Sequence, residues 1–134
     1  MKLTIASFFT FLTTLSFSQD FNGVWADSSS TSFGNCYAIF SVQNDSVFMT
    51  HYAEFNGNPF VEHGEGIVIG NKLQYSVVVT TKVPGWETTA GKHILVLSND
   101  KKTLRGTYSD NTGNSGPLVF KKQFPKKQIS LNID

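Results

Sequence analysis

Short runs of alternating hydrophobic and polar residues, separated by turn residues, cover most of this chain. The clearest run is 73–80, in which Leu73, Tyr75, Val77 and Val79 alternate over most of the run with the polar residues Gln74 and Ser76. This period of two predicts a strand with one buried face. Similar runs are found at 36–42, 47–55, 60–69, 93–97, 104–109 and 118–120. No segment longer than a turn or two has helical periodicity, so the pattern predicts an all-β protein.

The spacing of the runs predicts the architecture. Counted from a first strand around Trp25, there are about eight strands at intervals of about ten residues, as in a single up-and-down antiparallel β-barrel. The connections alternate in length. We expect the roomier ones at one end, as an open mouth, and the tighter ones at the other end, closed by Trp25. The roomier connections are 27–35, 56–59, 82–91 and 110–116, and the tighter ones are 43–45, 70–71 and 98–102.

The N-terminal segment has the features of a secretory signal peptide. Lys2 precedes an apolar run from Leu3 to Phe17, which ends in small residues suited to cleavage after Ser18. This run is too short and too rich in hydroxyl groups for stable membrane insertion, which needs about 20 apolar residues. We therefore expect a signal peptide at 1–18, a barrel domain at 19–122 and an extended tail at 123–134, with a secreted or periplasmic location.

The net charge and the cysteine content limit the partners and the chemistry that the protein can have. Without Lys2 the chain has equal numbers of basic and acidic residues, which argues against a nucleic-acid partner because such partners need a basic surface. Cys36 is the single cysteine and cannot form an internal disulfide. Its hydrophobic neighbours favour a buried position over a free reactive thiol.

Two motifs indicate a family. The segment Phe21-Asn22-Gly23-Val24-Trp25 begins the first strand, and a Gly-Thr-Tyr sequence lies in the late strand 104–110. With the strand plan, they resemble the calycin group of lipocalins, fatty-acid-binding proteins and avidins, as a small bacterial-type exported relative. The resemblance implies that Gly23 and Trp25 close the barrel and that a basic side chain, here Arg105, packs over the indole. The chain departs from lipocalins in lacking their disulfide and C-terminal helix.

Candidate catalytic and metal-binding residues are few. His51 and the segment Glu62-His63-Gly64-Glu65 form the densest titratable group, and two imidazoles with a carboxylate could bind a transition metal. Glu62 and His63 must point to opposite faces of a strand, however. We favour a solvated strand face and expect no metal site, no cofactor and no catalytic residues.

The mouth is the predicted binding region. Trp86 follows Pro84-Gly85 in a mouth loop, where it could anchor a partner or fold back over the barrel. The other candidate ligand-binding residues are Tyr37, Tyr75, Tyr108 and His51. The alternation along the strands does not by itself show whether the tyrosines point into the lumen or into the packed core. We expect an exported protein that holds a small apolar or amphipathic molecule in its barrel. The alternatives are a protein-binding module, such as an inhibitor of a secreted hydrolase, and a small barrel enzyme.

Overall fold

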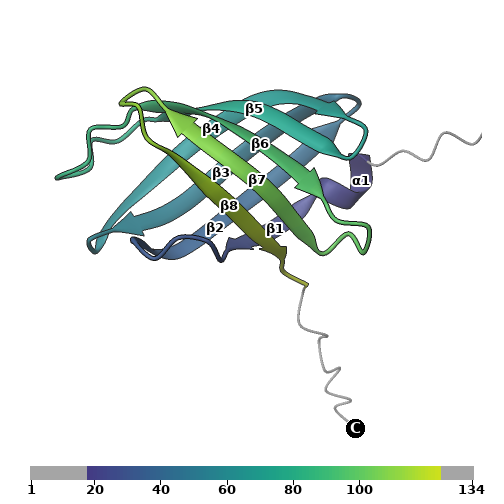
Figure 1. The fold of residues 1–134 in the computed structure, drawn as a ribbon, viewed down its shortest axis with the longest axis horizontal. Coiled ribbons are helices and arrows are strands. Elements are labelled where there is room, and N and C mark those ends of the chain that lie inside the picture. The colour runs from purple at the N-terminus through teal and green to yellow at the C-terminus, as the bar shows by residue number, and fades with distance from the viewer. Residues whose placement is uncertain (1–17, 125–134) are drawn as a thin grey trace, which may run out of the picture.

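The computed structural model describes residues 18–124 and contains a closed, eight-stranded antiparallel barrel in which each strand pairs with its neighbours in sequence and β1 pairs with β8 (Figure 1). The elements are α1 (Ser18–Phe21), β1 (Gly23–Asp27), β2 (Phe33–Gln43), β3 (Ser46–Phe55), β4 (Asn58–Ile69), β5 (Lys72–Val79), β6 (Ala90–Leu97), β7 (Thr103–Asp110) and β8 (Ser115–Lys122). The predicted all-β up-and-down barrel is confirmed.

Most residues of the two expected terminal segments lie outside the part of the chain that the structure describes. Nearly all of the predicted signal peptide, and the tail from residue 125 onward, lie outside the described residues. Between residues 18 and 124, no helix is long and apolar enough to cross a membrane.

The connections separate to the two ends of the barrel as expected (Figure 1). The end with the β1–β2, β3–β4, β5–β6 and β7–β8 connections is called the mouth, and the end beside α1 is called the base. One predicted loop is wrong: the roomy connection 56–59 is a two-residue turn, because Asn58 and Pro59 already pair with β3. Both turn residues have positive φ, 50° at Asn56 and 76° at Gly57, as a tight hairpin turn requires.

The base is filled by aromatic and aliphatic side chains. Trp25 is fully buried, and its indole Nε1 donates a hydrogen bond of 2.8 Å to the carbonyl oxygen of Phe21 in α1. Trp25 also meets Phe40 edge to face, and Phe40 in turn meets Phe120. These contacts make the lower half of the lumen a packed hydrophobic core.

The cation above the indole is Lys122, not the expected Arg105. The Lys122 ammonium lies 5.2 Å from the centre of the Trp25 ring and donates a hydrogen bond to the backbone carbonyl of Asp20. Arg105 is on β7 with its side chain exposed. β8, which pairs with β1 at Trp25 and Lys122, brings the basic side chain to this position.

A close approach of β6 and β7 explains one glycine of the family-like motif. Gly106 pairs with Leu95, and a Cβ atom at Gly106 would overlap the backbone carbonyl of Ile94. A glycine at this position lets the two strands coil tightly around the barrel.

Candidate functional site

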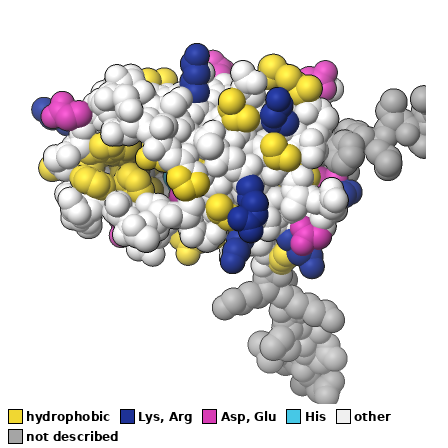
Figure 2. All heavy atoms as spheres, viewed as in Figure 1, with side chains coloured by type: hydrophobic (Ala, Val, Ile, Leu, Met, Phe, Trp, Pro, Cys, Tyr) yellow, Lys and Arg dark blue, Asp and Glu magenta, His cyan; other side chains and the backbone are white. Residues whose placement is uncertain are grey.

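The upper half of the lumen is hollow, unlike the base. A cavity of about 440 Å³ lies beneath the mouth, with side chains from all eight strands and from the mouth loops in its wall. This volume falls within the range of about 300–1,000 Å³ that is usual for small-molecule sites. Hydrophobic side chains gather in a hollow toward the mouth end of the surface, at the left in Figure 2.

An aromatic cluster borders the upper part of this cavity. The cluster, here called the rim cluster, consists of Phe33, Phe55, Phe60 and Trp86, which pack against one another. The ring centres of Phe60 and Trp86 are only 4.4 Å apart. Trp86 also contacts Phe33 and Phe55, at 5.5 and 6.0 Å between ring centres. Trp86 is therefore half-buried: it folds back onto the barrel and also forms part of the cavity wall.

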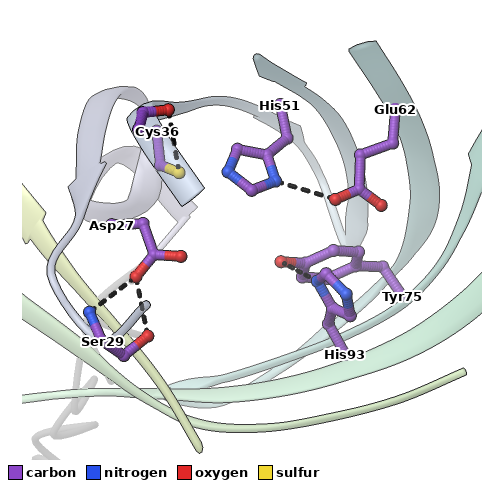
Figure 3. A network of polar contacts seen from close by, with 8 residues as sticks. Asp27, Ser29, Cys36, His51, Glu62, Tyr75 and His93 are labelled. Carbon is purple, nitrogen blue, oxygen red and sulfur yellow. Dashed lines mark hydrogen bonds and ion pairs between the residues drawn. The ribbon is translucent and has the colours of Figure 1, made fainter. Parts of the chain in front are cut away.

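A polar layer lies between the rim cluster and the hydrophobic base. It consists of His51, Glu62, Tyr75 and His93, all of them buried and directed into the lumen (Figure 3). His51 Nδ1 is 2.8 Å from Glu62 Oε1, and His93 Nδ1 is 3.1 Å from the Tyr75 hydroxyl. Each pair joins cross-strand partners, His51 with Glu62 across β3–β4 and Tyr75 with His93 across β5–β6.

Burial determines the protonation of two groups in this layer. Desolvation lowers the pKa of His93 to about 4, despite a nearby Glu62 carboxylate that acts in the opposite direction. Desolvation also raises the pKa of Tyr75 well above its ordinary value. The hydrogen bond between them therefore joins two neutral groups near pH 7.

His51 has one satisfied and one unsatisfied ring nitrogen. A carboxylate only accepts hydrogen bonds, so Nδ1 carries the proton that is donated to Glu62. The other nitrogen, Nε2, is buried and has no hydrogen-bond partner within residues 18–124. In the neutral imidazole this nitrogen presents a lone pair.

Two more polar side chains approach His51 from β1 and β2. Asp27 Oδ1 accepts hydrogen bonds from the backbone nitrogen and the hydroxyl of Ser29, at 2.8 and 2.7 Å. Cys36 is buried, and its thiol lies 3.5 Å from the backbone carbonyl of Gly34. Burial, and to a lesser degree the charge of Asp27, raises the pKa of the Cys36 thiol to about 11.

A β-bulge in β2 sets the direction of Cys36. The pairing of β2 with β3 shifts between Gly34 and Tyr37, where Asn35 has a φ of 46°. The extra residue lets both Phe33 and Cys36 contribute to the mouth-end hydrophobic cluster, although they are three positions apart. A bulge commonly redirects a side chain next to a functional site.

The predicted site residues are only partly brought together. His51 and Tyr75 lie in the polar layer, and Trp86 and half-buried Tyr108 border the cavity. Tyr37 does not belong to this group, because it points outward and is 44% exposed.

The residues that the sequence suggested as a metal-binding group lie on opposite faces of β4. His63 and Glu65 are exposed on the outer face of β4, whereas Glu62 is buried inside, as the alternation of a strand requires.

Sequence reasoning missed the roles of Asp27 and His93. Asp27 was assigned to a loop, but it is the last residue of β1. His93 is not among the residues predicted from the sequence to bind a ligand, yet it alternates with Leu95 and Leu97 on β6, and this parity could have placed it in the lumen.

No protein-family model matches this chain, and no curated protein matches its sequence.

Proposed function

We propose that this protein is an exported binding protein of the lipocalin-like type, which holds a small amphipathic molecule in the upper half of its barrel. The observation that carries this proposal is the cavity of about 440 Å³ with an aromatic rim and a polar floor. An apolar cavity with a few placed polar groups is the usual form of a small-molecule site.

The two zones of the cavity suggest how the ligand is oriented. Its apolar part packs against Phe33, Phe60 and Trp86 near the mouth. Its polar group reaches down to His51 and His93, whose burial strengthens hydrogen bonds to a ligand that excludes water. A purely apolar ligand would leave His51 Nε2 without a partner, and such burial of an unpaired polar atom costs about 1–3 kcal/mol.

A cavity-filling substitution tests the proposal. Ala53 is 1% exposed and forms part of the cavity wall, so Ala53→Phe places a ring in the space that the ligand needs. Ser76→Ala, on the exposed face of β5, serves as the control. We expect wild type and the control to retain the same small molecules from a lipid and metabolite extract, and Ala53→Phe to lose them while keeping its β-sheet circular dichroism.

Equal retention by Ala53→Phe would place the ligand outside the barrel. No retention by wild type, from extracts of the host's own envelope and medium, would refute the carrier function. The protein-binding alternative would then be tested by recovering partners with wild type and with Trp86→Ala.

One observation favours an enzyme as the second candidate. Glu62 orients His51, and a carboxylate-oriented imidazole is a common general base. Cys36 is a poor nucleophile for such an enzyme because its raised pKa keeps the thiol protonated. Conversion of the retained molecule by wild type, but not by His51→Asn, would show that the cavity is an active site.

A further inference from the structure

Three consecutive strands bring a carboxylate, a thiol and an imidazole together at one side of the cavity. Asp27, Cys36 and His51 come from β1, β2 and β3, and one ligand-type atom of each lies within 4.8 Å of the others. Glu62, on β4, stands behind His51 (Figure 3). We propose that Asp27, Cys36 and His51 form a binding site for a divalent transition-metal ion, with Zn²⁺ as the ion that best suits these ligands.

The orphaned nitrogen of His51 is independent evidence for a ligand. His51 is 6% exposed, and its Nε2 has no partner among the described residues while Nδ1 is engaged by Glu62. The ring therefore turns Nε2 away from Glu62, toward the side of the lumen where Asp27 and Cys36 lie (Figure 3). A buried polar atom without a partner is costly, and coordination of a metal ion would satisfy it.

His51 and Asp27 are each oriented by a neighbouring side chain, and Cys36 by the backbone bulge in β2. Glu62 accepts from His51 Nδ1, which is the arrangement that fixes a metal-binding imidazole and increases its basicity. Ser29 holds Asp27 through Oδ1, and in Figure 3 the second carboxylate oxygen points toward the lumen. The bulge at Asn35 helps to place Cys36 at the mouth end of the lumen.

The chemistry and spacing suit Zn²⁺. Thiolate, imidazole and carboxylate are the three side-chain ligands that Zn²⁺ commonly uses, and its bond lengths place tetrahedral ligand atoms about 3.3–3.6 Å apart. The three atoms here lie within 4.8 Å of one another, so side-chain rotations that move these atoms by about an ångström would close the site. Three protein ligands leave a fourth position open, on the cavity side, since Asp27 and His51 line the lumen.

Binding involves a simple exchange of a proton for a metal ion. The S–H bond of Cys36 breaks, its proton passes to solvent and an S–Zn bond forms, while His51 and Asp27 donate lone pairs. No oxidant or reductant takes part. Because the protein supplies all three coordinating groups, the ion binds without the proposed organic ligand, although both would use His51 Nε2.

Metal titration of the full-length, chelator-stripped and reduced protein tests this proposal. We expect one Zn²⁺ per chain with a Kd below about 1 µM, and a thiolate-to-metal charge-transfer band when Co²⁺ replaces Zn²⁺. Bound Co²⁺ without this band would exclude Cys36 as a ligand. Failure of wild type to bind Zn²⁺ at about 10 µM would overturn the proposal.

Variants separate coordination from folding. Cys36→Ser should abolish the Co²⁺ charge-transfer band and weaken Zn²⁺ binding by more than 100-fold. Glu62→Gln, which changes the group behind His51 and none of the three ligands, should weaken binding about 10–100-fold and keep the band. His63→Gln, on the outer face of β4, is the matched control and should bind as wild type does.

Apo-protein melting curves identify any variant that fails to fold, and the Co²⁺ band of wild type still decides the role of Cys36 in that case. Unchanged Zn²⁺ affinity in Cys36→Ser, or equal loss in His63→Gln, would contradict the site. These titrations contain no organic ligand, so their failure leaves the carrier proposal intact, and failure of the extract experiment leaves the metal site intact.

Discussion

Acidification should destabilise this barrel through a single buried histidine. Burial of His93 on β6 lowers its pKa to about 4, from an ordinary value of 6.5. The unfolded chain therefore binds a proton more tightly than the native barrel does. The free energy of unfolding therefore keeps its full value above about pH 6.5, and it falls progressively as the pH is lowered toward about 4.

The magnitude follows from the size of this shift. Each pKa unit corresponds to 1.36 kcal/mol, so the full effect is about 3 kcal/mol. This is a large part of the ~5–15 kcal/mol that stabilises a typical domain. Glu62, His51 and Asp27 also influence this pKa, so a comparison with a variant is needed to isolate the contribution of His93.

Urea unfolding of wild type and His93→Asn, at about pH 7.5 and about pH 4.5, measures that contribution. Asparagine keeps a polar atom near the Tyr75 hydroxyl but does not titrate in this range. Chelator in every sample excludes bound metal. On lowering the pH, we expect wild type to lose about 2–3 kcal/mol more than the variant. Equal losses in the two proteins would refute the conclusion that His93 is buried in its neutral form.

Two further predictions concern the base of the barrel. Trp25→Ala should reduce the free energy of unfolding by about 3–5 kcal/mol, because it removes a fully buried indole and leaves a cavity, and chemical denaturation would measure the loss. Lys122→Met should cost about 0.5–2 kcal/mol through loss of the cation over the Trp25 ring, whereas Arg105→Met should cost less than about 0.5 kcal/mol; the reverse order would contradict the observed packing.

The barrel could be predicted from the sequence because its determinants are local. A period of two along each strand, turn residues between strands and alternating connection lengths are all visible in the chain. The connection at 56–59 was misjudged for a local reason too. Asn56 and Gly57 suffice for the turn, which leaves Pro59 inside β4, where proline is uncommon within a sheet.

The side chains of the site depend on pairing between strands, which a single sequence does not show. Cys36 lies near His51 because of the register of β2 on β3 and the bulge at Asn35. Lys122 replaces Arg105 over Trp25 because β8 closes the barrel onto β1.

Parity along each strand carries information that sequence reasoning did not use fully. Glu62 and His93 occupy the same alternation as their buried neighbours Phe60 and Leu95, which predicts a lumen position for both. Polar residues at buried positions of a strand are expensive. They were the strongest available signal of a site in the upper barrel.

Native mass spectrometry of the protein as recovered from its host's envelope and medium tests the central claim most directly. The account predicts a non-covalent adduct of a few hundred daltons that is lost on denaturation and is absent from Ala53→Phe prepared in the same way. A smaller adduct matching a metal ion would report on the Asp27, Cys36 and His51 site separately. Wild-type protein that shows no organic adduct, even after soaking with lipid extract, would contradict the claim that the barrel is a carrier.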